Sequence, residues 1–495
     1  MKKKQLVQIL AIVLALLLAG GAVVSAVISA AWAEAEPPAR DACEMSIVVY
    51  EEEQALQVTQ RLVYMNRTSV TLDSVCFYLY GNMLRRESAL VYEAGEIEAA
   101  FPAGYAPGGI EFSSITVDGA EADWGVMGEN ELYLRVSCAL EPGKAAEFGF
   151  EFTVLYTEND AFLGAGETDL RCSGFYPVPA MTDSSGDFVL NAPVSFARTA
   201  FCPLIDYTVE LALPAGYDLA AAGVPEALGE NRWRVRVVAH EFAFSLSRRW
   251  RLSEAETACG TKVRFYGNLR RRDAQALSWF TEALEQCETW FGPLPGGALT
   301  LAQSDCVPAC LDFDGLVWLN SDLLSGSAAE LKLELRRRAA RQYFGFLASP
   351  DPAADAWLSD AVSLYAAYLL LEEEAGADAY LDALNRDVLP ALRVTMPGGL
   401  EITSAANLFT ASEYQIIVCE RGVAALPMLR CAMGRDALLD GLRRFADQGR
   451  AADAVGEYDL LDALEAASGR SWEDYLADWL FNIDEYDIQR LEWLG

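Results

Sequence analysis

The feature that most constrains the fold of this chain is a pair of helix-forming segments joined by a proline-containing turn. The pair occupies Leu331–Glu374. In the first segment, apolar residues recur at helical spacing as far as Gly345. A turn with two prolines follows, and a second helical pattern begins near Trp357 and ends in an acidic cluster, Glu372–Glu374. The pattern therefore predicts a helix, a turn and a second helix, and we interpret the remaining chain around this pair.

The first of these helices carries an unusual run of arginines. Arg337 and Arg341 are four residues apart, so both side chains lie on one helical face. Like charges at this spacing disfavour a helix by a few tenths of a kcal/mol unless acids oppose them. Glu334 and Arg338 form an opposite-charge i, i+4 pair on a neighbouring face. Two interpretations remain open for the run: a solvated helix face, or arginines that are paired with acids inside the protein.

The segment pair resembles the active-site helices of the aminopeptidase N (membrane alanyl aminopeptidase) family of zinc metallopeptidases. The phrase Gln342-Tyr343-Phe344-Gly345 stands where the family has Gln-Trp-Phe-Gly. The phrase Trp357-Leu358-Ser359-Asp360-Ala361-Val362 stands where it has Trp-Leu-Asn-Glu-Gly-Phe. Phrases such as Phe175-Tyr176-Pro177 extend the resemblance toward the N-terminus. The resemblance implies a gluzincin-type peptidase scaffold for nearly the whole chain.

The catalytic positions of that scaffold carry different side chains here. By the resemblance, the two histidine ligands of zinc fall on Arg337 and Arg341, and the third ligand, a glutamate, falls on Asp360. The general-base glutamate falls on Arg338, and the transition-state tyrosine falls on Cys419. Arginine stays protonated and has only donors, so it neither binds zinc nor takes a proton from water. A thiol is a weak donor and too short to replace the phenol. We therefore expect no bound zinc, no other cofactor and no catalytic residues.

Two acids and one hydroxyl could still build a binding cleft with the arginines. Asp312 falls where a family glutamate holds the free α-amine of the substrate, but it is one methylene shorter, and a simple loop acid is the alternative. Tyr414 either points into the same cleft or belongs to the core. Two arginines against one certain acid, Asp360, predict a surplus of positive charge that holds Asp312 or recruits a peptide carboxylate.

The chain contains one histidine, His240, in the phrase Ala239–Phe242. This phrase looks like half of a zinc motif, but Phe244 occupies the position of a second ligand. With one histidine, we expect neither a histidine-rich zinc site nor a Ser-His-Asp triad. Cys419 also lacks a neighbouring base, so we do not expect it to act as a nucleophile. We interpret His240 as an ordinary strand residue.

Residues 1–35 predict export. A basic start is followed by an uncharged run up to Ala33, and Ala31-Trp32-Ala33 has the small-x-small form of a signal-peptidase site. The run is also long enough to span a bilayer, so a cleaved signal peptide and a membrane anchor both remain open. Either one places the rest of the chain outside the cytoplasm. The formal net charge of −34 argues against a nucleic-acid partner, because phosphate binding needs a basic surface.

The remaining chain predicts a multidomain α+β fold. Residues 36–256 show short alternating runs broken by Gly, Pro and Asn, which predict an antiparallel β-sandwich-like domain. Residues 257–495 begin with strands around one helix and then become almost entirely helical, which resembles the thermolysin-like domain of the family. The strands expected in the first domain include residues 45–50, 56–63, 74–80, 131–136, 146–156, 207–213 and 233–238.

Three hypotheses for function follow. The leading one is an exported, catalytically inactive peptidase homologue. It would bind peptides or a protein partner through the cleft that corresponds to the active site of the family. The second is an active zinc aminopeptidase, as the family implies, which would need ligands that the sequence does not supply. The third is a structural cell-envelope protein whose cleft is filled by its own ion pairs. The sequence leaves the identity of the ligand and the oligomeric state open.

Overall fold

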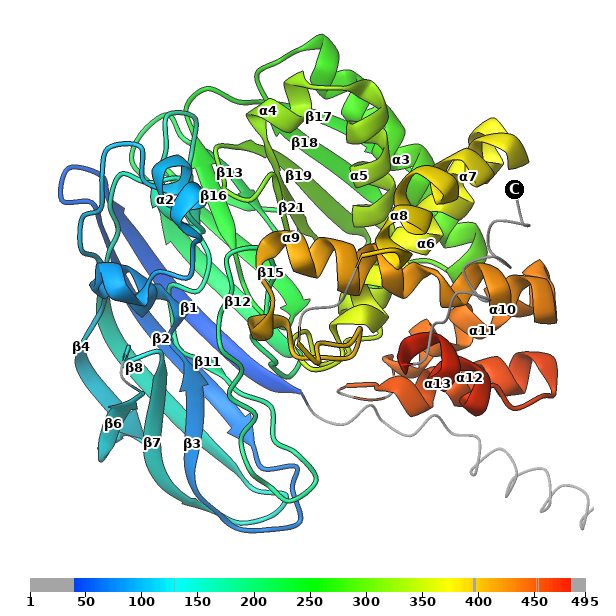
Figure 1. The fold of residues 1–495 in the computed structure, drawn as a ribbon. Helices are drawn as coiled ribbons and strands as arrows, with labels where there is room; N and C mark the ends of the chain where they lie inside the picture. Colours follow the sequence, from blue (N-terminus) through cyan, green and yellow to red (C-terminus); the bar gives the residue numbers. More distant parts are fainter. Residues whose placement is uncertain (1–39, 129, 395–397, 451, 453, 482–495) are drawn as a thin grey trace, which may run out of the picture. The chain divides into compact units, whose positions relative to one another are not determined.

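The computed structural model describes residues 40–128, 130–394, 398–450, 452 and 454–481. Strands make up the first part of these ranges and helices most of the second part (Figure 1). The expected leader, residues 1–35, lies outside the described residues. Within the described ranges, no helix combines the length and the apolar character needed to cross a membrane.

An eight-stranded sheet organises the first region, in the order β14-β15-β12-β1-β2-β8-β4-β5. Strands β1 (Asp41–Tyr50) and β2 (Ala55–Met65) pair antiparallel, and buried and exposed residues alternate along both. This alternation arises because successive side chains of a strand point to opposite faces. The other strands are β4 (Gly109–Val117), β5 (Ala120–Glu121), β8 (Ala145–Leu155), β12 (Ile205–Ala212), β14 (Glu226–Gly229) and β15 (Arg232–Ala239). The expected antiparallel pairing holds throughout this sheet except between β1 and β12, which are parallel.

Two four-stranded sheets complete the β-rich region. One has the order β13-β16-β10-β9 and the other the order β11-β3-β7-β6. Phe77 on β3 packs against Phe148 and Phe150 on β8 with ring centroids 5.5 and 5.3 Å apart, which joins the β3 sheet to the large sheet. The strands of these two sheets are β3 (Leu72–Tyr78), β6 (Trp124–Met127), β7 (Tyr133–Leu140), β9 (Leu163–Ala165), β10 (Leu170–Cys172), β11 (Val178–Pro179), β13 (Asp218–Ala221) and β16 (Phe244–Ser247).

A mixed five-stranded sheet opens the second region, in the order β17-β18-β19-β21-β20. Its strands are β17 (Arg251–Glu256), β18 (Lys262–Gly267), β19 (Ala298–Ser304), β20 (Cys310–Phe313) and β21 (Leu316–Asn320). Helix α3 (Arg271–Phe291) connects the parallel strands β18 and β19. Because β17 pairs with β18, strand pairing crosses the domain boundary that was expected between residues 256 and 257.

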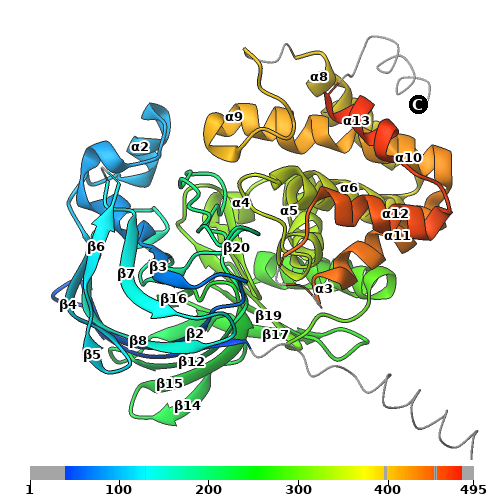
Figure 2. The ribbon, with the colours of Figure 1, turned by 90° about the horizontal axis from the view of Figure 1, so that it is seen from below.

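The predicted helix pair lies at the centre of the second region. Helix α5 (Ala328–Arg341) continues into a π-helical segment, η3 (Gln342–Leu347), and helix α6 (Ala356–Ala375) is buried from Ala356 to Leu370. Figures 1 and 2 show α3, α5 and α6 on the side of the five-stranded sheet that faces away from the eight-stranded sheet. The remaining helices are α2 (Ala94–Ala100), α4 (Ser321–Ser325), α7 (Ala377–Ala383), α8 (Leu389–Leu392), α9 (Ala411–Tyr414), α10 (Ala425–Met433), α11 (Arg435–Gln448), α12 (Glu457–Ser468) and α13 (Glu473–Phe481).

Candidate functional site

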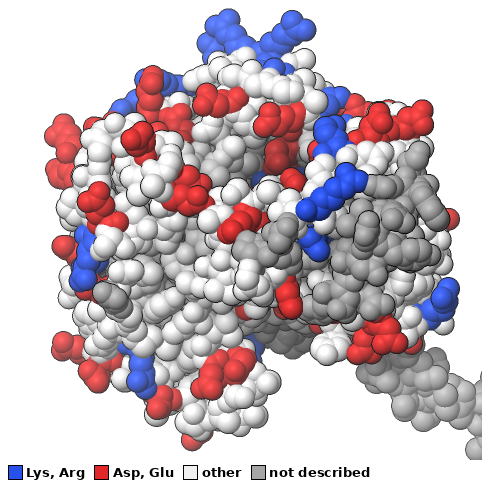
Figure 3. Space-filling view, viewed as in Figure 1, with Lys and Arg blue, Asp and Glu red and all other residues white. Residues whose placement is uncertain are grey.

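Two arginines of α5 and one aspartate of α6 meet between these helices. Arg337 Nη2 donates to Asp360 Oδ1 at 2.9 Å, and Arg341 Nη1 donates to the same oxygen. The three residues are only 4–6% exposed. The pairing expected from the sequence is therefore present. Arg337 and Arg341 therefore do not belong to a solvated helix face. On the molecular face shown in Figure 3, acidic side chains are scattered over the surface.

A second aspartate joins this group from the five-stranded sheet. Arg341 Nε donates to Asp312 Oδ2 at 2.9 Å, and Arg338 Nη1 donates to Asp312 Oδ1 at 3.3 Å. Arg338 Nη2 donates to Glu334 Oε2 at 3.0 Å, which is the i, i+4 pair predicted from the sequence. The ion cluster consists of Asp312, Glu334, Arg337, Arg338, Arg341 and Asp360.

The ion cluster decides one expectation about charge and corrects one about ligand binding. Three guanidinium groups face three carboxylates, so the surplus of Arg337 and Arg341 over Asp360 is balanced within the cluster. Asp312 supplies the balancing charge, which is the first of the two outcomes expected from the sequence. Asp312 is also no loop acid free to hold an amine, because both of its carboxylate oxygens already accept hydrogen bonds from guanidinium groups.

The end of α9 adds a hydroxyl, and the segment after α9 adds a thiol. Tyr414 donates its O–H to Asp360 Oδ2 at 2.7 Å, so it points into the cleft rather than only into the core. Cys419, on the π-helical segment η6 (Gln415–Arg421), lies 3.1 Å from Arg337 Nη2. A Cβ atom at Gly422 would lie 2.8 Å from Ala361 Cβ, so a glycine is needed for this segment to approach α6 closely. Both η3 and η6 are π-helical, a feature that is frequent at functional sites.

Burial and charge act in opposite directions on the acids and thiols of this site. Burial raises the pKa of Asp360, but the charges of Arg341 and Arg337 and the Tyr414 hydrogen bond outweigh burial, so its pKa lies well below the usual range. Burial raises the pKa of the Cys419 thiol to about 12 against the opposing charge of Arg337. Asp360 is therefore ionised and Cys419 is a neutral thiol, which does not suit a nucleophile.

The depressed pKa of Asp360 predicts an acid-sensitive contribution to stability. Because the folded pKa lies below the unfolded value, this contribution is complete above about pH 4 and is lost as the pH falls toward the folded pKa. Urea unfolding of the protein and of Asp360→Asn should show a large difference at neutral pH that shrinks at about pH 3. A difference in unfolding free energy that stays constant across this range would contradict the assignment.

The side chains present do not fit a zinc ion. Zinc in proteins is held by thiolate, imidazole or carboxylate groups, whereas two of the three positions assigned by the resemblance carry guanidinium groups with donors only. Both oxygens of the third, Asp360, accept hydrogen bonds from Arg337, Arg341 and Tyr414. In the part of the chain that the structure describes, no group of three or more His, Cys, Asp or Glu side chains is placed to hold a metal ion.

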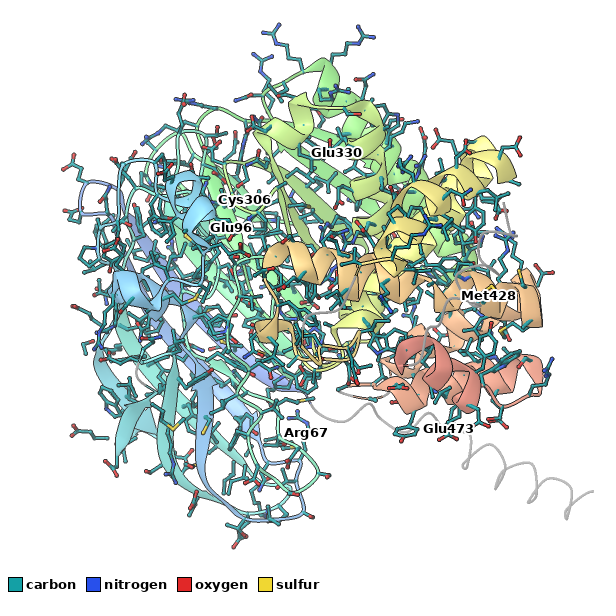
Figure 4. The ribbon with its side chains drawn as sticks, in the orientation of Figure 1. Arg67, Glu96, Cys306, Glu330, Met428 and Glu473 are labelled. Atoms are coloured by element: carbon teal, nitrogen blue, oxygen red, sulfur yellow. The ribbon has the colours of Figure 1, made fainter. Side chains whose placement is uncertain are left out.

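A pocket of about 220 Å³ lies beside the ion cluster. Its other lining residues include Phe196–Arg198 from the β-rich region, Pro308–Leu311 at the start of β20, and Gln415. Exposed Glu330, near the start of α5 (Figure 4), contributes a further carboxylate to the lining. Pockets that enclose drug-sized ligands have volumes of about 300–1,000 Å³. This pocket therefore has room for one side chain rather than for an extended peptide.

The single histidine belongs to a second polar group, separate from the ion cluster. His240 lies just after β15, with its Nδ1 2.8 Å from Asp314 Oδ1 and its Nε2 2.8 Å from Ser349 Oγ. His240 therefore lies one residue beyond the strand in which it was expected, and both of its ring nitrogens are hydrogen-bonded. The argument that one histidine excludes a Ser-His-Asp arrangement is wrong, because such an arrangement needs only one. No spacing in the sequence relates these three residues, so sequence reasoning could not have found them.

The fold matches solved structures of zinc metallopeptidases. The M1 zinc metallopeptidase from Deinococcus radiodurans matches with a TM-score of 0.61 at 16% identity, covering 90% of this chain and 95% of that one. A mutant of that enzyme bound to a Tyr-Ser-Ala substrate matches with a TM-score of 0.61 at 15% identity over the same shares. This chain has the fold of the M1 metallopeptidases. The predicted α+β fold, with a β-rich first region and a helical later part, is confirmed at this level.

Curated relatives support the M1 family at the level of sequence. Aminopeptidase N of Lactobacillus delbrueckii subsp. lactis is 25% identical over 406 residues, which are 74% of this chain and 45% of the relative. Aminopeptidase M1-B of Oryza sativa subsp. japonica is 24% identical over 243 residues, which are 46% of this chain and 27% of the relative. This M1-like chain thus spans less than half the length of these relatives. No family model matches it.

Proposed function

We propose that this chain is a catalytically inactive homologue of the zinc aminopeptidases, in which the ion cluster takes the structural place of the metal. The observation that carries the proposal is the pairing at Asp360. Its two oxygens accept hydrogen bonds from Arg337, Arg341 and Tyr414, so the carboxylate that would bind zinc is already engaged by three donors. A guanidinium group forks onto carboxylates in a fixed geometry, which suits it to join two helices without metal.

The position of the general base supports the same conclusion. Arg338, which the resemblance places there, donates to Asp312 and Glu334 and has no lone pair that could accept a proton from water. The Tyr414 hydroxyl is held by Asp360 and is not free to stabilise an oxyanion. Neither activation of water nor stabilisation of a tetrahedral intermediate has a side chain to perform it at this site.

Among non-catalytic roles, the geometry favours a cleft filled largely by its own ion pairs. Asp312 is engaged by Arg338 and Arg341, and the remaining volume is about 220 Å³. A second candidate is capture of one cationic side chain of a peptide or protein partner, which exposed Glu330 at the pocket favours. From the N-terminal sequence we also propose that the protein works outside the cytoplasm, either secreted or membrane-anchored.

Metal content and activity, measured together, test this proposal. We expect elemental analysis of the purified protein to find far less than one zinc per chain, and aminoacyl-amide hydrolysis to stay at background with or without added zinc. The matched control is Asp360→Ala, which should leave both readings unchanged. The proposal fails if about one zinc per chain is found and lost in Asp360→Ala, or if a chelator removes measurable hydrolysis.

A further inference from the structure

Three residues from distant parts of the chain form a continuous hydrogen-bonded group outside the ion cluster. His240 follows β15, Asp314 lies in the turn between β20 and β21, and Ser349 lies two residues after η3. His240 Nδ1 is 2.8 Å from Asp314 Oδ1, and His240 Nε2 is 2.8 Å from Ser349 Oγ. The three residues are 1%, 8% and 5% exposed. They have the connectivity of a nucleophile, a base and an acid that orients the base.

The partners of the imidazole determine its proton arrangement. An ionised carboxylate only accepts hydrogen bonds, so Asp314 places the proton of a neutral imidazole on Nδ1. Nε2 is then an acceptor, and the Ser349 hydroxyl donates to it. The second oxygen of Asp314 accepts the backbone N–H of His240 at 3.2 Å, which fixes the ring relative to the carboxylate. This tautomer is the one in which histidine can take a proton from serine.

The electrostatic surroundings keep Asp314 ionised. Burial raises the pKa of Asp314, but the hydrogen bonds from His240 and the charge of Arg198 oppose burial, and the pKa lies below the usual value. Ser349 has a backbone φ of +54° although it is not glycine, and such a conformation is costly for a residue with a Cβ atom. Strained conformations of this kind cluster at functional sites.

We propose that Ser349 is a base-activated nucleophile that accepts acyl groups from small carboxylic esters, with His240 as its general base and Asp314 as the residue that positions His240. Ser349 is only 5% exposed, which argues against a folded or extended peptide as the substrate and restricts the proposal to small esters. This activity needs no metal and uses no residue of the ion cluster, so it is independent of the function proposed above.

The chemistry balances with water as the only co-reactant. Ser349 Oγ forms a bond to the ester carbonyl carbon while its proton moves to His240 Nε2. The tetrahedral intermediate collapses, the bond to the alcohol oxygen breaks, and the leaving alkoxide takes the proton from His240. Water then attacks the acyl-serine with His240 again as base. The carboxylic acid leaves, and Ser349 is regenerated.

A purely structural role for the same hydrogen bonds predicts a different result. In that case replacing Ser349 or His240 would lower stability, and the native protein would not react with serine-directed electrophiles. The two roles are therefore distinguished by covalent labelling rather than by stability. Ser349→Gly is the informative variant, because glycine adopts a positive φ without strain while it removes the hydroxyl.

The test is labelling of the full chain with a small alkyl fluorophosphonate, followed by peptide mass spectrometry, together with hydrolysis of p-nitrophenyl acetate. We expect one adduct on Ser349, and labelling and hydrolysis reduced about 100-fold or more in Ser349→Gly and His240→Gln. Asp314→Asn should also reduce both by 10- to 10,000-fold because the imidazole tautomer changes. Addition of a chelator should change neither reading.

The matched control is Ser195→Ala. Ser195 is also buried, and its hydroxyl donates to the Glu96 carboxylate at 2.9 Å, but that contact includes no imidazole. This variant should be labelled at the native rate. The proposal is overturned if native protein carries no adduct on Ser349 under excess reagent, or if Ser349→Gly is labelled and hydrolyses the ester as fast as native protein. Either outcome would leave the hydrogen-bonded group with a structural role only.

Discussion

Replacing Asp360 by alanine is expected to lower the free energy of unfolding by about 3–5 kcal/mol. Arg337 and Arg341 share Asp360 Oδ1 as acceptor, and the variant would leave both guanidinium groups buried without it. Tyr414 would lose the acceptor of its hydroxyl as well. Breaking a buried ion pair on one side costs far more than the net contribution of the pair, because the remaining charge stays desolvated. Urea unfolding and the melting temperature measure this loss.

The control for this prediction is a surface ion pair in the same region. Asp447 on α11 pairs with Arg443 of the same helix and with Arg450 just after it, and its side chain is 39% exposed. Asp447→Ala should cost no more than about 1 kcal/mol, since exposed pairs are largely solvated. Asp360→Asn should fall between the two alanine variants, because the amide oxygen can still accept a hydrogen bond from an arginine. Equal losses for Asp360→Ala and Asp447→Ala would show that the ion cluster does not hold α5 against α6.

The second large effect is expected when the two arginines of the ion cluster become histidines. Arg337→His combined with Arg341→His places two imidazoles at i, i+4 spacing beside Asp360, which is a zinc-binding arrangement. The variant leaves Arg338 facing the three acids Asp312, Glu334 and Asp360, so two negative charges are unbalanced. A divalent cation supplies the missing charge. We therefore expect a variant that is unstable alone and is stabilised by zinc.

Thermal unfolding with and without zinc checks this expectation. A ligand that binds only the folded state at 100 times its Kd stabilises by about 2.7 kcal/mol, and the melting temperature should rise accordingly. The native protein should not respond, because its cluster is already neutral. Arg337→Gln combined with Arg341→Gln removes the same charges without supplying metal ligands, so zinc should not stabilise it. If zinc leaves the histidine variant unchanged, this part of the scaffold no longer has the geometry of a metal site.

The ion cluster does not satisfy all of its own polar groups. Arg337 Nε and Arg338 Nε are buried and make no hydrogen bond within the described residues. Such unmade hydrogen bonds cost free energy, so the net contribution of the cluster to stability is smaller than its number of ion pairs suggests. Its main consequence is positional. It ties α5, α6 and β20 together through side chains that are costly to separate one at a time.

The sequence alone predicted much of the local structure. The helix pair was found because apolar residues at helical spacing mark the buried face of a helix, and the predicted second helix corresponds to α6 (Ala356–Ala375). Alternating residues marked strands such as β2 (Ala55–Met65) for the same reason. The sequence also indicated that Arg337 and Arg341 cannot act as zinc ligands, since the chemistry of a guanidinium group does not depend on its surroundings.

Only the tertiary structure decided how the charges balance and what the histidine does. Asp312 reaches Arg341 across 29 residues of chain, and His240 reaches Asp314 across 74 and Ser349 across 109. Periodicity reports which face of its own element a residue occupies. It does not report which remote element packs against that face, because this depends on the path of the whole chain. The charge balance of the ion cluster and the Ser349–His240–Asp314 group both arise from such remote contacts. Local sequence predicts neither, and the pairing at Asp360 was expected only through the resemblance to the family.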